Sequence, residues 1–497
     1  MGFSGVESHK LCIWRRFATK YYFLRNVIGL FWVFAGAVFA VFALACWIFT
    51  GSAGGFGLSA LLAAVLGFAL YRSARTPVEP MGVEALVATA LIWISLPLIG
   101  MMPYLAAGLS PIDAIFEAVS GLTTTGATIL TDFEALSPVH FVYRGFTQWV
   151  GGIGVTVLFI AVLPQLAVAG RQLFFTETTG VQKEKLTPKV RQTANGVLRV
   201  YLLWTAVAFL GYMAGGIGIY EALANALATV PAGGFSPNPQ SFASYSYLTQ
   251  WIACLVMFFA GVNFMLQYRA VRERKSDFLL MDPEFRAYAV LILGFGVAMA
   301  LWLALNQGQG MIPALTHGFF QTISIMTGTG FASADFAQWA IPVQIVLLGL
   351  MLIGGSAGSA GGGVKVVRWI LVIKHIGREL KRALHPHAVL NLRYGTRTVG
   401  EDVLRSVFAF LGLYVVILGA GILLISVFEQ DFVVAISSAM ACLGNVGPGL
   451  GAVGPMGSFG DLSVVSKATL TFLMWAGRLE LIPVFLLFYP ETWRSLR

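Results

Sequence analysis

Apolar runs long enough to cross a lipid bilayer recur from Asn26 almost to the C-terminus of this chain. A membrane-spanning helix needs about 20 mostly apolar residues. Only 11% of the 497 residues are charged, whereas roughly a quarter are charged in an ordinary soluble domain. The first run, residues 26–50, follows five basic residues and is too long for the apolar part of a cleaved signal peptide. We therefore expect an all-α polytopic membrane protein with a cytoplasmic N-terminus.

The basic residues predict how the chain crosses the membrane. All but three of the 32 lysines and arginines fall in six clusters, at residues 1–25, 71–80, 171–199, 269–286, 365–405 and 494–497. Basic loops lie on the cytoplasmic side of membrane proteins. Each stretch between two clusters must then cross an even number of times, which puts both termini in the cytoplasm. The net charge of +9 is thus a topology signal, and we expect contact with anionic lipid and no nucleic-acid partner.

The lengths of these stretches indicate what lies between the basic clusters. Residues 26–71 fit two helices joined by the tight turn GSAGG at residues 51–55. The later stretches, roughly residues 81–170, 200–268, 287–364 and 406–493, each hold about 25 to 40 residues more than two spans require. We expect about 10 spanning helices, with the surplus residues forming additional short elements.

The first surplus begins with SPIDAIFEAVSGL, residues 110–122. Ser110 suits a helix N-cap, Pro111 suits the first helical position, and Asp113 suits the positive end of the helix dipole. A helix of about 12 residues extends some 18 Å, which is too short for a hydrocarbon core of about 30 Å. GLTTTGATIL, residues 121–130, follows it and is a poor helix former because of its threonines and glycines. We predict a half-helix that enters the membrane and returns as irregular backbone.

The same order recurs in each later stretch. EALANALATV at 221–230 precedes PAGGFSP, ALTHGFFQTISIM at 314–326 precedes TGTGFAS, and FVVAISSAMACL at 432–443 precedes GNVGPGL. The motifs TTTG, PAGG, TGTG and GNVG then align, with glycines at 126, 234, 330 and 447. This period predicts four repeats of helix, pore helix, loop and helix. The expected segments are an N-terminal hairpin at 1–80 and pore repeats at 81–193, 194–280, 281–400 and 401–497.

Four such loops favour a pore over ordinary glycine-rich turns. Irregular backbone at membrane depth survives where it is buried in protein or lines an aqueous path. Loops around a pseudo-fourfold axis would present rings of carbonyls, which replace the hydration shell of a cation. The negative C-terminal ends of four short helices would stabilise that cation further. One such motif is typical of close helix packing, but four in register indicate a cation filter.

The combination TTTGAT, AGGFS, TGTGF and NVGPGLG, with QWVGGIGV at 148–155 and GGSAGSAGGGVK at 354–365, resembles the TrkH branch of the Trk/Ktr/HKT potassium transporters. The resemblance implies a homodimer in a bacterial inner membrane, regulated by a cytosolic TrkA-type nucleotide-binding subunit, with K⁺ as the transported ion and no tightly bound cofactor. It implies filter carbonyls from Thr124, Thr125, Ala232, Gly233, Gly328, Thr329, Asn445 and Val446, with filter glycines Gly126, Gly234, Gly330 and Gly447. Related sodium-conducting proteins carry serine at the first of these glycines.

The segment GGSAGSAGGG at 354–363 interrupts the second helix of the third repeat. Six of its ten residues are glycine, so the helix must break there. The resemblance implies a gate loop beneath the filter, formed by Gly354, Gly355, Ser356, Gly358, Gly361, Gly362 and Gly363.

Arg478 lies near the middle of the last apolar run. An arginine at membrane depth costs free energy unless it faces water or a partner. The resemblance places it beside the gate, and the alternatives are a helix-packing face for the glycines and a structural ion pair for the arginine.

Two other functions are compatible with parts of the sequence. A symporter that couples K⁺ uptake to Na⁺ or H⁺ would need an acidic residue buried beside the filter. A serine hydrolase could use Ser356 within G-x-S-x-G, but it needs a histidine base, and His317 is the one candidate at membrane depth. We therefore expect a channel-like transporter and no enzyme.

Acidic residues in the outer segments could attract cations: Asp113, Glu117, Asp132, Glu134, Glu221, Glu429, Asp431 and Asp461.

Overall fold

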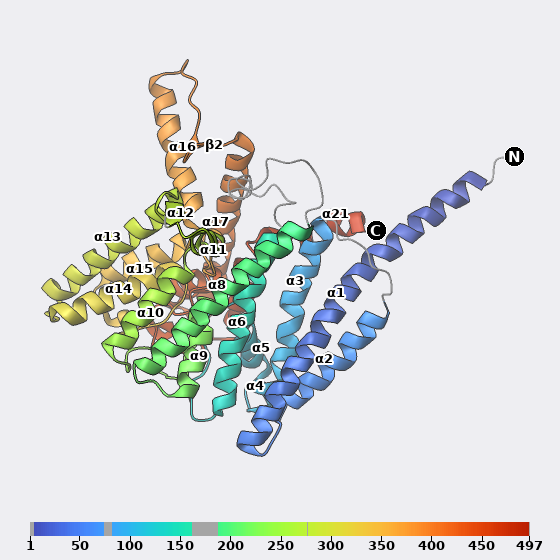
Figure 1. The fold of residues 1–497 in the computed structure, drawn as a ribbon, viewed down its shortest axis with the longest axis horizontal. Helices are drawn as coiled ribbons and strands as arrows, with labels where there is room; N and C mark the ends of the chain where they lie inside the picture. The colour runs from blue at the N-terminus through green and yellow to red at the C-terminus, as the bar shows by residue number, and fades with distance from the viewer. Residues whose placement is uncertain (1–3, 74–81, 162–186, 276, 497) are drawn as a thin grey trace. The chain divides into compact units, whose positions relative to one another are not determined.

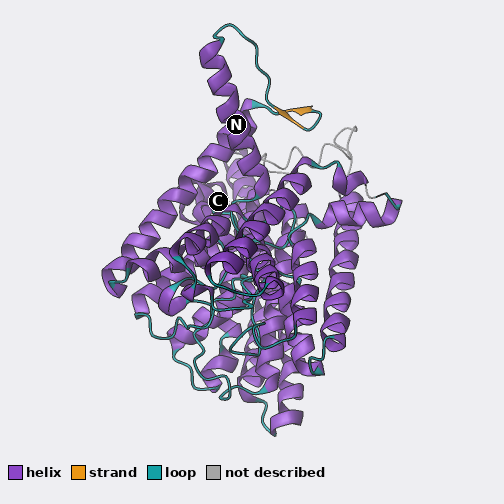
Figure 2. Cartoon of the chain, turned by 90° about the vertical axis from the view of Figure 1, so that its left-hand side faces the viewer, coloured by secondary structure: helices purple, strands orange, loops and turns teal. Residues whose placement is uncertain are grey.

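The structure, a computed structural model, describes residues 4–73, 82–161, 187–275 and 277–496. These residues are mostly helical, with loops between the helices and one small pair of strands (Figure 2). The chain divides into two compact units. Unit 1 contains residues 1–118 and 479–497, and unit 2 contains residues 119–478.

Unit 1 begins with the expected helical hairpin. Helix α1 (Ser4–Thr50) and helix α2 (Gly54–Arg72) run antiparallel, and α3 (Gly82–Gly100), α4 (Met102–Ala106) and the start of α5 (Pro111–Leu122) follow (Figure 1). The unit ends with α20 (Ile482–Phe488) and α21 (Pro490–Leu496). Trp32 Nε1 donates to Ser95 Oγ at 3.1 Å, which ties α1 to α3. Large apolar side chains on α1 and α2 are exposed, as lipid-facing residues are: Phe34, Trp47, Phe49 and Leu61.

Unit 2 contains the end of the first predicted repeat, the second and third repeats, and most of the fourth. Its helices are α6 (Pro138–Ala161), α8 (Thr187–Ala214), α9 (Ile219–Thr229), α10 (Tyr247–Ala260), α11 (Phe264–Glu273), α12 (Asp277–Leu280), α13 (Pro283–Asn306), α14 (Met311–Thr327), α15 (Ile341–Ile353), α16 (Val366–Leu384), α17 (Glu401–Glu429), α18 (Phe432–Leu443) and α19 (Val464–Arg478). Two 3₁₀ turns, η2 (Phe336–Gln338) and η3 (Gly451–Val453), lie in the loops. A hairpin of β1 (Arg393–Tyr394) and β2 (Arg397–Thr398) follows α16.

The four predicted half-helices are confirmed as α5, α9, α14 and α18. Three of them have 11 or 12 residues. Ser110 caps α5 as expected, because its Oγ accepts from the Asp113 amide at 3.3 Å. Helix α14 is longer, with 17 residues, and begins before the predicted start at residue 314. Pro313 lies in its first turn, where proline is tolerated because that N–H would lack an intrahelical partner.

Within the described residues, the long spans are fewer than the predicted ten. Six described helices are long and apolar enough to cross a membrane, or up to eight if each of two bent helix pairs counts as one span. Helices α10 and α11 meet at 96° across residues 261–263. Helix α15 has 13 residues and ends where the glycine-rich segment begins. The break after α15 was predicted from the glycine-rich segment and is confirmed, whereas the bend between α10 and α11 was not predicted.

The hairpin of unit 1 depends on glycines that let α1 and α2 approach closely. A Cβ on Gly67 would lie 2.7 Å from the backbone nitrogen of Val33. We expect Gly67→Val to lower the thermal unfolding midpoint of the purified chain in detergent, because overpacking costs about 1–3 kcal/mol. The matched control is Gly294→Val in α13, where an added Cβ meets nothing within 4 Å. Equal shifts for the two variants would contradict the packing explanation.

Candidate functional site

Each of the four short helices ends in the same left-handed turn. The second residue of each four-residue motif has a positive φ: Thr124 (53°), Ala232 (56°), Gly328 (78°) and Asn445 (52°). The closing glycine also has a positive φ: Gly126 (83°), Gly234 (80°), Gly330 (80°) and Gly447 (100°). A positive φ is unusual for threonine and alanine and costs free energy, and such residues cluster at functional sites.

The backbone hydrogen bonds of these turns are also repeated four times. The amide of the second residue donates to the carbonyl three residues earlier, at 3.0–3.2 Å: Thr124 to Gly121, Ala232 to Thr229, Gly328 to Ile325 and Asn445 to Cys442. The amide of the third residue donates to the carbonyl five residues earlier, at 2.8–2.9 Å: Thr125 to Ser120, Gly233 to Ala228, Thr329 to Ser324 and Val446 to Ala441. Both bonds define the Schellman motif that ends many helices. The turns therefore satisfy helix-end carbonyls while the chain reverses direction.

The closing glycines place the four loops in a closed ring. An added Cβ on each glycine would lie 1.9–2.6 Å from a carbonyl oxygen in the loop of the next motif along the chain, and the fourth motif meets the first. The pairs are Gly126 with Gly233, Gly234 with Thr329, Gly330 with Val446, and Gly447 with Thr125. All twelve filter residues named from the sequence therefore lie in one ring of backbone.

Side chains tie adjoining parts of the ring together. Asn445 Nδ2 donates to Thr125 Oγ1 and to the Met474 carbonyl, each at 2.9 Å. Gln148 Nε2 donates to the Gly233 carbonyl at 2.6 Å, and Gln148 Oε1 accepts from the Phe235 amide at 3.2 Å. The Gly233 carbonyl, which was expected to face an ion, thus already has a protein donor. The sequence reasoning missed Gln148 as a ring residue, although it begins the motif QWVGGIGV.

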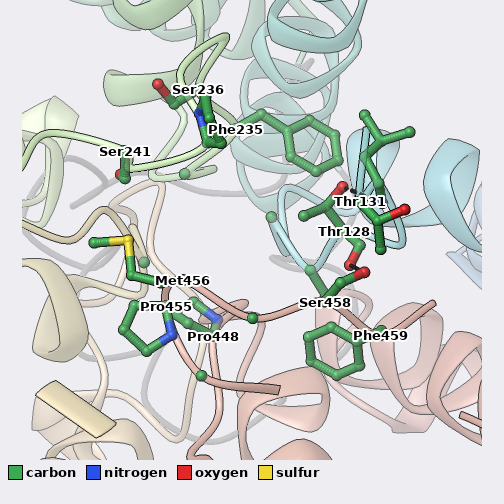
Figure 3. Close-up of a pocket in the computed structure, with 18 of the residues that line it drawn as sticks. Thr128, Thr131, Phe235, Ser236, Ser241, Pro448, Pro455, Met456, Ser458 and Phe459 are labelled. Atoms are coloured by element: carbon green, nitrogen blue, oxygen red, sulfur yellow. Dashed lines mark hydrogen bonds between the residues drawn. The ribbon is translucent and has the colours of Figure 1, made fainter. Parts of the chain in front are cut away.

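A cavity of about 380 Å³ opens beyond the closing glycines. Its walls come from the loops after the first, second and fourth motifs, and Figure 3 shows Thr128, Ser236 and Ser458 around it. Arg144 lines this cavity although its side chain is buried. Its guanidinium lies 3.9 Å from the Phe235 ring centroid, and Nη2 donates to Thr128 Oγ1 at 2.9 Å. In the sequence, Arg144 is distinguished by its position outside every basic cluster.

The acidic residues expected at an outer mouth do not form one group. Asp461 lines the cavity and is exposed. Glu117 is fully buried on α5, five residues before that helix ends. Residues Asp132, Glu134 and Asp431 are exposed, and Asp113, Glu221 and Glu429 are partly exposed. A role in attracting cations therefore suits Asp461 better than Glu117.

The glycine-rich segment 354–363 lies against the start of two ring motifs. A Cβ on Gly361 would lie 2.3 Å from the Thr327 carbonyl oxygen. One on Gly362 would lie 2.1 Å from the Gly444 carbonyl oxygen. These approaches exclude side chains at Gly361 and Gly362, and a Cβ on Gly363 would lie 2.9 Å from Gly354 Cα.

Backbone hydrogen bonds hold this segment to the bend between α10 and α11. The Ser356 amide donates to the Gly261 carbonyl at 2.9 Å, and the Ala360 amide donates to the Ala260 carbonyl at 3.2 Å. In return, the Phe264 amide donates to the Gly358 carbonyl at 3.2 Å. The bend between α10 and α11 therefore supplies backbone hydrogen-bond partners for the glycine-rich segment.

Basic side chains also hold the segment. Arg478 is buried, and its Nη1 donates to the Ala360 carbonyl at 2.9 Å. Arg478 Nε and Nη2 have no hydrogen-bond partner among the described residues. Lys365 Nζ donates to the Gly361 carbonyl. The predicted proximity of Arg478 to the glycine-rich segment is therefore present.

Ser356 lacks the surroundings of a hydrolase nucleophile. Its Oγ is buried and has no hydrogen-bond partner among the described residues. The candidate base His317 instead pairs through Nδ1 with Ser333 Oγ at 2.9 Å. A serine nucleophile needs a base within hydrogen-bond reach, so the hydrolase hypothesis has no geometric support.

Comparisons with known proteins agree with this architecture. A profile of the TrkH family, described as cation transport proteins, matches residues 59–495. The chain is 36% identical to the Trk system potassium uptake protein TrkH of Halomonas elongata, over 83% of this chain and 86% of that protein. It is 34% identical to the Escherichia coli K12 protein of the same name, with the same coverage. The crystal structure of the potassium transporter TrkH from Vibrio parahaemolyticus matches with a TM-score of 0.88 and 29% identity, covering 95% of this chain and 100% of that one.

Gln148 makes two buried hydrogen bonds to the second loop of the ring, so its loss is expected to destabilise the protein. Gln148→Leu leaves the Gly233 carbonyl and the Phe235 amide without this partner, and each buried unsatisfied group costs about 1–3 kcal/mol. We expect a lower thermal unfolding midpoint in detergent. The control is Gln338→Leu, because Gln338 is exposed. An unchanged midpoint for Gln148→Leu would show that the two bonds contribute nothing.

Proposed function

Because the chain belongs to the TrkH family of cation transport proteins, we propose that it takes up potassium by channel-like conduction through the ring of four loops. The main observation behind the proposal is the ring of loops. The closing glycines Gly126, Gly234 and Gly330 each lie against the next loop, and Gly447 lies against the first loop. The relatives named above are potassium uptake proteins. The ring would act as the cation filter of four pore repeats around a pseudo-fourfold axis.

Three physical features support this proposal. The ring lies in irregular backbone, which at membrane depth is compatible with an aqueous path. The C-terminal ends of α5, α9, α14 and α18 lead directly into it, and their partial negative charge favours a cation. The closing glycines Gly126, Gly234 and Gly330 also line the outer cavity, so an ion in that cavity would lie next to the ring.

The glycine-rich segment would be the gate. Its contacts with the Thr327 and Gly444 carbonyls put it beside the inner part of two ring motifs. The positive charge of Arg478, which is hydrogen-bonded to this segment, would oppose the passage of a cation. Gating would then require Arg478 and the segment to move together.

The proposed setting is a bacterial inner membrane with both termini in the cytoplasm. The placement of both termini in the cytoplasm rests on the positions of the basic clusters. We also propose a homodimer regulated by a cytosolic TrkA-type subunit, with lipid as a further partner. Relatives named as parts of a Trk system support the regulatory subunit. Helix α16 presents exposed Ile373, Ile376, Leu380 and Leu384, which would suit contact with either partner.

Coupled symport is the second candidate, and one observation favours it. A coupling site needs an acidic residue buried near the ion path, and Glu117 is fully buried on the short helix α5. In that mechanism Na⁺ or H⁺ would drive K⁺ uptake. Conduction through the ring would then depend on a second ion gradient.

The two mechanisms differ in ion flux through the purified chain in liposomes. Fluxes of K⁺, Rb⁺, Na⁺ and Li⁺ would be measured with and without an imposed Na⁺ or H⁺ gradient. Passive conduction predicts K⁺ and Rb⁺ flux without that gradient. Flux that requires the gradient would establish symport, and the absence of any cation flux with the regulatory subunit supplied would overturn both mechanisms.

The filter glycine of the first motif is expected to control ion preference. Gly126→Ser adds a Cβ at φ 83°, where it would lie 2.1 Å from the Gly233 carbonyl oxygen. We expect a lower ratio of K⁺ to Na⁺ flux in liposomes. Gly216→Ser is the matched control, because Gly216 has φ 93° but meets nothing within 4 Å. A similar change in both variants would indicate backbone strain without a filter role.

Removal of the gate arginine is expected to increase conduction. Arg478→Ala deletes a buried positive charge and the hydrogen bond to Ala360. K⁺ flux per folded protein should rise several-fold in liposomes. Arg405→Ala, which removes an exposed arginine of α17, is the control. Unchanged flux in well-folded Arg478→Ala protein would refute its role at the gate.

A further inference from the structure

Glu284 is a buried carboxylate at the start of α13. It is the second residue of that helix and is 1% exposed. An acidic residue in the first turn is ordinary, because the helix dipole favours negative charge there. Such residues are usually solvated, however, and a buried carboxylate requires hydrogen-bond donors.

The donors come from two other parts of unit 2. Glu284 Oε1 accepts from the Ala357 amide at 2.9 Å and from the Val367 amide at 3.0 Å. Ala357 lies inside the glycine-rich segment, and Val367 is the second residue of α16. The first amides of a helix lack intrahelical partners. Glu284 therefore caps α16 from a different helix and holds the glycine-rich segment with the same oxygen atom.

Ala357 lies at the centre of the contact with the α10–α11 bend. Its neighbours Ser356 and Gly358 make the backbone hydrogen bonds to Gly261 and Phe264. The Ala357 amide is instead bound by Glu284. One carboxylate oxygen thus joins the start of α13, the middle of the segment and the start of α16.

The composition of the segment makes this connection important. Glycines gain more conformational entropy than other residues when released, and the segment has few side chains that could fix its position by packing. Both the Ala357 and the Val367 amide depend on one acceptor atom, Glu284 Oε1, and a buried amide that loses its partner costs free energy. Displacement of the segment relative to α13 or α16 must break at least one of the two bonds to Glu284.

We propose that Glu284 is a positioning residue that clamps the gate in its non-conducting position and links it to α16. This inference rests on the proposed function of the segment as a gate. Glu284 acts through the Ala357 and Val367 amides and does not contact the ring. Its removal should change how often the pore opens, while an open pore keeps its conductance and ion preference.

The test uses the full-length chain in planar bilayers and liposomes. Wild-type K⁺ conductance is measured first, because its absence would refute the proposed function and not the clamp specifically. Glu284→Ala removes the acceptor, and we expect a several-fold rise in open probability with unchanged unitary conductance and K⁺/Na⁺ ratio. Glu284→Gln keeps one oxygen acceptor but replaces the other oxygen with an NH₂ donor, and we expect a smaller rise.

Controls separate positioning from a general structural role. Glu273→Gln on α11 removes a carboxylate that is 45% exposed and lies 3.9 Å from Arg269, and it should leave open probability unchanged. If Glu284→Ala fails to fold, Glu284→Gln decides the result. Equal open probability in Glu284→Gln and wild type, or a change in unitary conductance, would overturn the clamp.

A double variant provides an independent test. Arg478 and Glu284 hold the same segment through Ala360 and Ala357. Effects on neighbouring residues of one network are not additive. Glu284→Gln combined with Arg478→Ala should therefore raise open probability by less than the product of the separate effects. Multiplicative effects would show that the two side chains act independently and would contradict the shared clamp.

Discussion

The left-handed turn at the end of each short helix is the constraint on which the candidate site depends. It satisfies the helix-end carbonyls through two local hydrogen bonds and returns the chain without lengthening the helix. The closing glycine can then lie against a carbonyl of the next loop, as Gly234 does against Thr329. A side chain at that position would meet the neighbouring loop, so glycine at all four positions allows the loops to approach one another this closely.

The glycine-rich segment, residues 354–363, is held in place without much side-chain packing. It must lie close to the ring carbonyls of Thr327 and Gly444, so it lacks the side chains that usually fix a segment by packing. Its position depends on backbone bonds to the broken helix pair α10–α11 and on a few polar side chains. Arg478 binds one of its carbonyls and Glu284 binds one of its amides. A segment held by a few hydrogen bonds can move when those bonds change partners. A packed apolar interface, in contrast, changes position only with extensive repacking.

The sequence was informative where local chemistry decides the structure. Ser110 and Pro111 marked the start of α5, and the glycine motifs marked the ends of all four short helices. It was less informative about breaks within apolar runs. Residues 261–263 contain one glycine and Asn263, whose side chain caps α11, but this short signal inside an apolar run did not predict the 96° bend. Gln148 and Glu284 were missed because their partners lie 73 or more residues away in the chain.

By itself the sequence determined that this chain crosses a membrane repeatedly, because apolar length and basic clusters act through partition between lipid and water. It also determined where the backbone cannot remain helical, because glycine and β-branched residues act locally. The tertiary structure decided which loop meets which, from Gly126 to Gly233 and finally from Gly447 to Thr125. It also decided which carbonyls and amides have side-chain partners. Those pairings join residues far apart in the chain, and only the packing of the helices brings them within hydrogen-bond distance.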